Sequence, residues 1–319
     1  MRFNVVMTAP RLAGPAVAVL ERAGCAIHYM PPYPSAEAVA EKTREVRADA
    51  ILTRQGPVTA AAMDASPVLR IVARHGVGVD DVDLAAAAAR GLLVTRAPGS
   101  NTAAVAEHTL ALILALAKDL KPLGTAIAGG AWRGGTTKVR DIAGMRLGLL
   151  GFGAIGQAVA RLAGAFGMAI AAFDPAAPDG AWDQVARAAS LPELLSRSEV
   201  LSLHCPFTPQ TRHIVDAGAL AAMPAGGYVI NTARGGLIDE SALAASLGSG
   251  HTAGAGLDVF ETEPPVPGDA LRDHPRVLVT PHVAGVTDGS LVNMGVMAAE
   301  CIAACLTGAP VPPGRVVRA

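Results

Sequence analysis

The sequence predicts an α/β protein built from two doubly wound parallel-sheet domains. Short apolar segments alternate with helical segments in two series, one over the first hundred residues and one that begins at Arg146. Short apolar strands separated by helices are typical of βα units, whose strands run parallel. The chain has 319 residues, which is long enough for two domains of ordinary size. Because ligands of such sheets bind at the carboxyl ends of the strands, we expect a ligand in the crevice between the domains.

The first series consists of alternating strands and helices. The strands are expected at Phe3–Thr8, Ala26–Met30, Ala50–Thr53, Arg70–Ala73 and Leu92–Thr95, and the helices at Leu12–Ala23, Ala36–Val46, Ala60–Ala65 and Leu84–Arg90. The pattern breaks at Pro98-Gly99-Ser100, after which Asn101 or Thr102 can cap a helix that runs to about Leu120. Since this helix is apolar nearly all round, we expect it to be buried between domains or subunits.

The second series has the same character. Its strands are expected at Leu147–Leu150, Ala169–Phe173, Val200–His204, Tyr228–Thr232, Ala253–Asp258 and Val277–Thr280, with helices between most of them. The tail returns to helix from Ser290 to Leu306, and a proline-rich segment from Pro310 to Pro313 ends the fold.

Composition and charge exclude several classes of protein. The chain is 51% hydrophobic and 17% charged, as expected for a globular protein, and its net charge of −1 does not favour nucleic acid or an anionic membrane as a partner. The first ten residues lack the apolar core of a signal peptide. The longest apolar candidate for a membrane span, Ala103–Ala117, contains Glu107 and His108, so we expect no transmembrane helix. The four cysteines form no CxxC pair, which favours a cytoplasmic protein with reduced thiols and without a metal site.

A glycine loop marks a dinucleotide site. Gly151, Gly153 and Gly156 have the GxGxxG spacing, which is weak evidence alone because the chain contains 35 glycines. The motif follows an apolar strand and opens an alanine-rich helix, where the helix N-terminus offers N–H groups to a pyrophosphate. Asp174 ends the next strand at the spacing expected of an acid that binds a ribose diol. Its charge, followed by Pro175 rather than a cation, favours NAD over NADP, although Asp174 could also be an ordinary acidic turn residue.

Polar residues follow three later strands. Arg234 comes after Tyr228–Thr232, Asp258 and Glu263 follow the next strand, and His282 follows the last. In a parallel sheet these positions share one edge. Each residue alone could be structural: Arg234 could pair with Asp239, and Glu263 could be a solvated acid. Together they form a set suited to 2-oxo acid reduction, in which Arg binds a carboxylate, His donates a proton and the acid orients the His.

The two glycines after Arg234 suggest a further detail of this site. We expect Gly235 and Gly236, which lack side chains, to leave room for substrate and cofactor beside the guanidinium.

Motifs over almost the whole chain match one pattern. They are "ADAILTRQGPVT", "ARHGVGVDDVDLAAAAARGLLV", "NTAAVAEHTLALILAL", "GLLGFGAIGQAVA", "LHCPFTPQTRHIV", "VINTARGGLIDESAL", "GLDVFETEPP" and "VTPHVAG". Together they resemble the D-isomer-specific 2-hydroxyacid dehydrogenases, nearest to the phosphoglycerate dehydrogenase and hydroxypyruvate/glyoxylate reductase branch. The resemblance implies a Rossmann NAD-binding domain at residues 99–282, inserted into a flavodoxin-like substrate domain formed by residues 1–98 and 283–319.

The resemblance also implies an activity and a set of site residues. The activity is hydride transfer between NAD and C2 of a small anionic D-2-hydroxy or 2-oxo acid, performed by a homodimer. Arg234 would hold the substrate carboxylate, His282 would be the acid/base, and Glu263 would be its partner. The backbone N–H groups of Gly76, Val77 and Gly78 would bind the substrate carboxylate, and Asp258 would contact the nicotinamide carboxamide. The remaining cofactor contacts would be Ala154 and Ile155 at the pyrophosphate, with Cys205, Pro206, Thr232 and Ala233 lining the cofactor.

The substrate remains open at this point. Arg54, Arg74, His75 and either Lys138 or Arg140 could meet a second anionic group, or could be solvated surface charges. Phosphoglycerate, hydroxypyruvate, glyoxylate and a sulfonated acid are all compatible, and His75 stands where the family usually has a small residue. The main alternative function is an NAD-sensing scaffold similar to the C-terminal-binding co-repressors. A formate- or phosphite-type oxidation is disfavoured, because formate enzymes of this superfamily generally have Gln at the position of Glu263.

Overall fold

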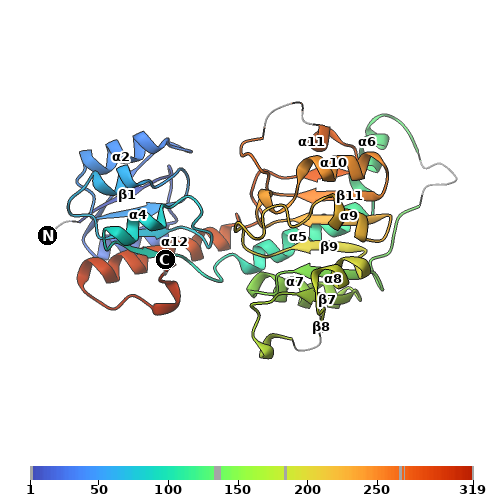
Figure 1. Ribbon diagram of the computed structural model, residues 1–319. Coiled ribbons are helices and arrows are strands. Elements are labelled where there is room, and N and C mark those ends of the chain that lie inside the picture. Colours follow the sequence, from blue (N-terminus) through green and yellow to red (C-terminus); the bar gives the residue numbers. More distant parts are fainter. Residues whose placement is uncertain (1–2, 133–137, 183–184, 266–267, 269, 318–319) are drawn as a thin grey trace. The chain divides into compact units, whose positions relative to one another are not determined.

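The computed structural model describes residues 3–132, 138–182, 185–265, 268 and 270–317. The chain divides into two compact units (Figure 1), the first formed by Met1–Asn101 with Val286–Ala319 and the second by Thr102–Gly285. The second unit is therefore inserted between two chain segments of the first. All strand pairs in both sheets are parallel within the described residues, which confirms the predicted fold class.

A five-stranded sheet forms the centre of the first unit, in the order β2-β1-β3-β4-β5. The strands are β1 (Phe3–Met7), β2 (Cys25–Tyr29), β3 (Ala50–Thr53), β4 (Ile71–Arg74) and β5 (Leu93–Thr95). This is the flavodoxin-like strand order, in which the chain reverses its direction of winding between β1 and β3. The loops that follow β3 and β4 both leave from the carboxyl edge of this sheet.

Helices cover both faces of the first sheet, and successive strand residues alternate between them. Val5 and Met7 pack in one core with α1 (Gly14–Arg22) and α12 (Asp288–Thr307), the red helix beside the blue strands in Figure 1. Val6 packs in the other core, with α2 (Ala36–Glu45), α3 (Ala60–Asp64) and α4 (Leu84–Ala89). This alternation of buried side chains explains why the strands are apolar throughout.

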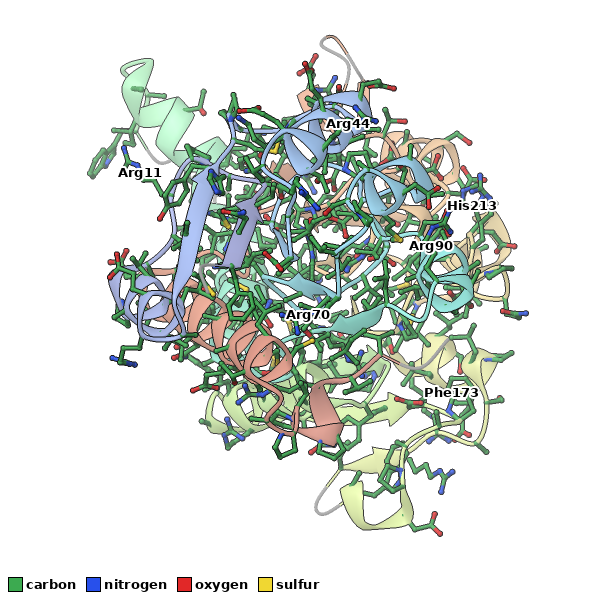
Figure 2. All side chains as sticks on the ribbon, turned by 90° about the vertical axis from the view of Figure 1, so that its left-hand side faces the viewer. Arg11, Arg44, Arg70, Arg90, Phe173 and His213 are labelled. Carbon is green, nitrogen blue, oxygen red and sulfur yellow. The ribbon has the colours of Figure 1, made fainter. Side chains whose placement is uncertain are left out.

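Arg70 joins the two chain segments of this unit. Its Nη2 donates a hydrogen bond to the Leu306 carbonyl near the end of α12 (3.3 Å), and its guanidinium lies 5.1 Å from the centroid of the Phe3 ring. Figure 2 labels Arg70 on the first unit. The cation–π contact and the carbonyl bond tie the returning tail to the first strand.

Helix α12 corrects one expectation about apolar segments. An 18-residue window of α12 has a mean hydropathy of 1.5. Among the described residues, α12 rather than Ala103–Ala117 is therefore the helix that is long and apolar enough, by length and composition, to cross a membrane. This is weak evidence for a membrane span, because core helices pass the same test, and α12 packs on α1 and β4 with 44% of the window buried.

A seven-stranded sheet forms the centre of the second unit, in the order β12-β11-β10-β9-β6-β7-β8. The strands are β6 (Arg146–Leu150), β7 (Ala169–Phe173), β8 (Ala186–Arg187), β9 (Val200–Leu203), β10 (Gly227–Asn231), β11 (Thr252–Leu257) and β12 (Val277–Val279). This is the Rossmann order extended by one strand, and the winding reverses between β6 and β9. The short edge strand β8 is an addition to the predicted set.

The helices of the second unit also lie on two faces. One core contains residues of α5 (Thr102–Ala117) and α7 (Ala154–Ala165), and the other contains residues of α8 (Leu191–Arg197), α9 (Ala217–Ala222), α10 (Glu240–Gly248) and α11 (Ala270–Asp273). Helix α5 packs on α7, β10 and β11, so its buried side chains belong to the core of this unit.

The long helix ends earlier than the sequence predicts. Asp119 adopts a left-handed backbone conformation (φ 52°), and a separate helix, α6 (Leu120–Ala128), follows it. None of the residues of α6 is buried.

Candidate active site

The glycine loop connects β6 to α7 at the carboxyl edge of the second sheet. Gly151 has a φ of +97°, and a Cβ there would come within 2.5 Å of the Cys205 backbone nitrogen. A Cβ at Gly156 would come within 2.4 Å of the Gly151 carbonyl oxygen. At Gly153 a Cβ would meet no atom of the described residues within 4 Å. The turn thus requires a glycine at position 151, and close packing requires one at position 156. The backbone at Gly153 borders open space, which a pyrophosphate site needs.

Ala154 and Ile155 form the first turn of α7, with Ala154 exposed and Ile155 half-buried. Within the described part of the chain, no side chain caps the N-terminus of this helix. The first N–H groups of the helix are therefore free of a side-chain cap at the position where the resemblance places the pyrophosphate.

Asp174 follows β7 beside this loop. Its Oδ2 accepts a hydrogen bond from the Phe152 N–H (2.8 Å) and its Oδ1 accepts one from the Ala176 N–H (2.8 Å). A carboxylate has about four acceptor positions, so each oxygen retains capacity for a ribose hydroxyl. The two backbone bonds make Asp174 an acidic turn residue. Because its side chain is only half-buried, it is also compatible with the predicted ribose site.

The loops after β9 and β10 continue the same edge. Cys205 is half-buried and Pro206 is exposed; burial raises the pKa of the Cys205 thiol to about 11, so this cysteine stays protonated near neutral pH. Thr232 is buried, with its hydroxyl 3.0 Å from that of Thr109 on α5. Ala233 is half-buried, and its N–H donates to the Asn231 side chain (3.0 Å).

Arg234 lies in a turn that is stabilised by the side chain of Asn231. The buried Asn231 amide donates to the Arg234 carbonyl (2.9 Å), which fixes the backbone at the point where the strand ends. The half-buried Arg234 side chain donates from Nη1 to the Ala233 carbonyl (2.7 Å). The guanidinium is thus placed by its own turn, at the carboxyl end of β10.

The two following glycines are required by contacts within the protein, and their expected role in leaving room for substrate and cofactor stays a prediction. A Cβ at Gly235 would lie within 2.0 Å of the Phe260 carbonyl group, and one at Gly236 would lie 2.7 Å from the Phe207 ring. These glycines therefore make room for neighbouring loops of the protein, and the observed contacts give no evidence of space reserved for substrate or cofactor.

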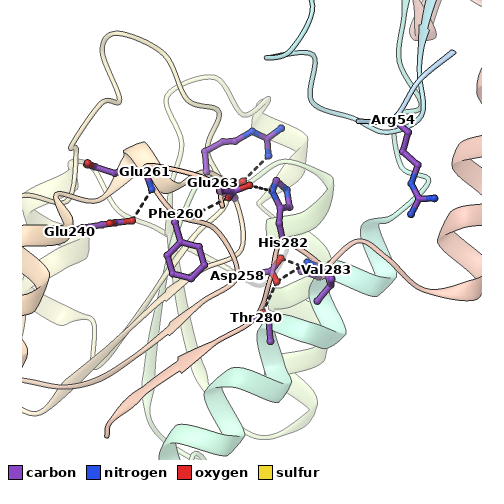
Figure 3. A network of polar contacts seen from close by, with 12 residues as sticks. Arg54, Glu240, Asp258, Phe260, Glu261, Glu263, Thr280, His282 and Val283 are labelled. Carbon is purple, nitrogen blue, oxygen red and sulfur yellow. Dashed lines mark hydrogen bonds and ion pairs between the residues drawn. The ribbon is translucent and has the colours of Figure 1, made fainter. Parts of the chain in front are cut away.

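His282 and Glu263 form a direct pair. His282 Nδ1 lies 2.7 Å from Glu263 Oε2, and Glu263 Oε1 accepts a bond from the Phe260 N–H (3.1 Å; Figure 3). Burial alone would raise the pKa of Glu263. The hydrogen bond and charge of His282, the Phe260 N–H and the charge of Arg234 all lower it, and together they outweigh burial, so the pKa of Glu263 lies below its ordinary value. The ionised carboxylate can only accept, so Nδ1 carries the proton of this bond. The Nε2 atom is left to exchange a proton with a ligand, and the ring is 52% exposed.

Asp258 differs from the charged residues Arg234, Glu263 and His282 of this edge because it is buried, with 1% exposure. Its Oδ1 accepts from Val283 N–H (2.9 Å) and its Oδ2 from Ala284 N–H (2.8 Å), while its backbone carbonyl accepts from His282 N–H (2.8 Å). Asp258 therefore holds the loop that carries His282. A contact with a nicotinamide carboxamide stays a prediction, for which Oδ2 retains one free acceptor position.

Several of the other predicted residues belong to the first unit. Arg54 and the Gly76–Gly78 loop follow β3 and β4 at the carboxyl edge of that sheet. Thr8 Oγ1 accepts from Arg54 N–H (2.9 Å), which fixes the backbone, whereas no side-chain hydrogen bond or ion pair of Arg54 is seen within the described part of the chain. The Arg74 side chain makes structural contacts within its own loop: it donates to the Gly78 carbonyl (2.9 Å) and pairs with Asp81 (2.6 Å).

His75 is a core residue, 5% exposed, that lies against α12. Burial, together with the charge of Arg54, lowers its pKa to about 4, so the ring is neutral near pH 7. A neutral buried ring is a poor partner for a second anion.

Arg140 occupies a different place from the candidate site. Its Nη1 donates to the Gly226 carbonyl (2.6 Å) and Nη2 lies 3.4 Å from Glu199, both of which precede strands. Arg140 is therefore at the amino edge of the second sheet, and Lys138 is an exposed residue close to it in sequence.

The family to which the chain belongs is evident from its relatives. Residues 110–284 match the sequence model described as the D-isomer specific 2-hydroxyacid dehydrogenase, NAD binding domain. The chain is 41% identical to D-3-phosphoglycerate dehydrogenase of Mycobacterium tuberculosis over 267 residues, which cover 83% of this chain and 50% of that protein. It is 40% identical to hydroxypyruvate reductase of Thermotoga maritima over 249 residues, which cover 77% of this chain and 80% of that protein.

The chain belongs to the D-isomer specific 2-hydroxyacid dehydrogenase family. The fold agrees: the TT0316 protein of Thermus thermophilus superposes with a TM-score of 0.90 at 34% identity, over 99% of this chain and 100% of that one. The NAD-binding domain of the family covers the second unit from α5 to the His282 loop. This chain spans about half the length of the phosphoglycerate dehydrogenase relatives it matches.

Sequence reasoning missed two residues that support the site. Thr280 donates from Oγ1 to Asp258 Oδ1 (2.5 Å), and His108 Nε2 lies 3.0 Å from the same hydroxyl. A hydroxyl two residues before His282 and a single histidine in an apolar helix were the available signals.

Proposed function

We propose that this protein is an NAD-dependent D-2-hydroxyacid dehydrogenase that acts on a small anionic 2-hydroxy or 2-oxo acid. The observation that carries the proposal is the Glu263–His282 pair, 2.7 Å apart, on the sheet edge that also holds Arg234 and the glycine loop. An acid/base histidine oriented by a carboxylate, with a guanidinium nearby, is the set that reduction of a 2-oxo acid requires.

Each residue then has a stated role in the reaction. Bound NADH supplies the hydride that C2 of the 2-oxo acid receives. His282 donates the proton of Nε2 to the C2 oxygen as this oxygen develops alkoxide character. Glu263 stabilises the charged imidazolium through Nδ1. Arg234 binds the substrate carboxylate with its two-pronged guanidinium, assisted by the backbone N–H groups of Gly76, Val77 and Gly78. Oxidation of the hydroxy acid follows the same steps in reverse.

The residues of the second unit fit NAD better than NADP. Gly153 leaves open space before the N-terminus of α7, and Asp174 keeps acceptor positions for ribose hydroxyls. The carboxylate of Asp174 would repel a 2′-phosphate. Contacts of Ala154, Ile155, Cys205, Pro206, Thr232, Ala233 and Asp258 with the cofactor belong to this proposal.

Arg54 is the residue most suited to a second anionic group on the substrate. Its backbone is fixed by Thr8, and its side chain extends from the sheet edge without a hydrogen bond among the residues that the structure describes (Figure 3). Arg74 and Arg140 are committed elsewhere, and His75 is neutral in the core. This favours a phosphorylated or sulfonated acid over glyoxylate, and hydroxypyruvate remains compatible.

We further propose a cytoplasmic homodimer. Helix α6 exposes Leu120 (58%) and Ile127 (54%), and apolar side chains grouped on one helix are typical of an interface between subunits. The scaffold alternative has no observation in its favour, since the relatives reported above carry the names of enzymes.

A panel of substrates tests the proposal. Purified protein would be mixed with NADH or NADPH and with glyoxylate, hydroxypyruvate, 3-phosphohydroxypyruvate or sulfopyruvate, and the loss of absorbance at the nicotinamide band recorded. NADH-dependent turnover with at least one acid, lost in His282→Ala by about 10²–10⁴-fold, supports the proposal. Turnover unaffected by His282→Ala, or no turnover with any of the acids, contradicts it.

A further inference from the structure

A line of hydrogen bonds connects helix α5 to the loop that carries His282, entirely within the second unit. His108 Nε2 lies 3.0 Å from Thr280 Oγ1, and Thr280 Oγ1 donates to Asp258 Oδ1 (2.5 Å). The same carboxylate accepts the N–H groups of Val283 and Ala284 (2.9 and 2.8 Å). Figure 3 shows Asp258 between Thr280 and Val283, with His282 above them.

The direction of each bond follows from the chemistry of the groups. The Thr280 hydroxyl donates its single hydrogen to Asp258 Oδ1. The hydroxyl oxygen can then only accept from His108, which means that Nε2 of His108 carries a proton. Nε2 also lies 3.9 Å from Asp258 Oδ1, so its N–H group faces the carboxylate as well as the threonine hydroxyl.

The network bears on His282 because that residue has an unfavourable backbone conformation. Its φ is +53°, in the left-handed region that residues other than glycine rarely adopt. Three bonds to Asp258 hold this conformation: the N–H of His282 to the backbone carbonyl, and the next two N–H groups to the carboxylate. A carboxylate that turned away from Val283 and Ala284 would release the turn and, with it, the direction of the imidazole.

We propose that His108 is a positioning residue for His282. It donates to Thr280, keeps the threonine hydroxyl directed at Asp258, and thereby locks the carboxylate against the turn that presents the imidazole to Glu263. His108 does not touch the reacting atoms, and its effect on turnover rests on the proposed function. Its effect on the conformation of the turn that carries His282 is independent of the proposed function.

Three variants test the proposal in the full-length protein. His108→Leu removes the donor, and His108→Gln restores a donor at the position of Nε2. The matched control is His251→Leu: His251 also uses Nε2 in a half-buried bond, to the Leu220 carbonyl (3.0 Å), but it precedes β11 at the opposite edge of the sheet. Amide hydrogen exchange would be followed for the segment with Val283 and Ala284, together with thermal stability, the Kd of NADH, kcat and KM.

The proposal predicts a specific pattern. In His108→Leu, exchange of the Val283–Ala284 segment rises by about tenfold or more, and kcat falls by about tenfold while the Kd of NADH is unchanged, as expected when one hydrogen bond to a charged network is lost. His108→Gln reverses most of both effects, with protection of the segment and kcat close to those of the parent. His251→Leu lowers thermal stability without either effect.

Other patterns overturn it. Unchanged protection of Val283 and Ala284 in His108→Leu shows that His108 does not hold the turn. Lower stability with normal kcat per folded molecule shows that the residue only packs. If the parent enzyme turns over none of the 2-oxo acids, the proposed function fails, but the exchange measurement still decides the positioning role.

Discussion

The buried imidazole of His75 makes the first unit sensitive to acid. Burial, with the charge of Arg54, lowers its pKa to about 4, against about 6.5 for an unfolded chain. The folded protein therefore binds fewer protons than the unfolded chain between these pH values. The stability that the neutral ring contributes is complete above about pH 6.5 and is lost as the pH falls toward 4. His75→Leu removes this titration with little change of volume.

The magnitude follows from the two pKa values. At pH 5 the unfolded histidine is almost fully protonated and the folded one almost fully neutral, which amounts to roughly 2 kcal/mol of lost stability, with a limit of roughly 3 kcal/mol below both pKa values. Urea unfolding followed by far-ultraviolet circular dichroism at pH 7 and pH 5 measures this. Tryptophan fluorescence recorded in parallel serves as a reference, because Trp132 and Trp182 both lie in the second unit.

The comparison between parent and variant isolates His75. Burial also lowers the pKa of His204 to about 4, but that residue is unchanged in both proteins, so its contribution cancels. His75→Leu should therefore lose about 2 kcal/mol less than the parent on going from pH 7 to pH 5. Equal losses in parent and variant would refute the claim that the ring is buried in its neutral form.

Three further predictions concern the candidate site. Asp174→Ser combined with Pro175→Arg should shift kcat/KM toward NADPH, because a charge repulsion is removed and a phosphate partner added; a parent that already prefers NADPH would refute this. Arg234→Lys should lower kcat/KM by about 10- to 150-fold, the equivalent of one charge-assisted bond, with unchanged NADH affinity and melting temperature; a destabilised variant with normal kcat/KM would mean that Arg234 serves the fold. Because the pKa of Glu263 lies below its ordinary value, its carboxylate is ionised above about pH 4.5. Glu263→Gln should thus lower kcat/KM for reduction throughout pH 5–8, and a pH profile that overlays the parent's would contradict the coupling with His282.

The fold was largely predictable because both sheets are parallel. Parallel strands are buried on both faces, so they appear in the sequence as short apolar runs, and the helices between them alternate regularly. Helix α6 could not be found in this way. Pro122 lies in the first turn of α6, where a proline lacks only an N–H group that would have no partner, so a helix forms there although proline usually ends one.

The candidate site was predictable in its members but not in its contacts. The ends of parallel strands share an edge, which is why Arg234, Glu263 and His282 could be grouped from sequence alone. Whether Asp258 is exposed or buried depends on how the loop after β12 folds back over β11, and this is long-range information. The same holds for Gly235, whose missing side chain accommodates the Phe260 backbone of another loop.

The most direct test of the central claim is the fate of the hydride. The protein would be incubated with a 2-oxo acid from the panel and NADH that carries deuterium at C4 on either face of the ring, and the product analysed by mass spectrometry and chiral chromatography. The account predicts a D-2-hydroxy acid with one deuterium at C2 from one of the two labelled cofactors, and loss of this product in His282→Ala. Oxidation of NADH without deuterium at C2, or a product of the L configuration, would contradict it.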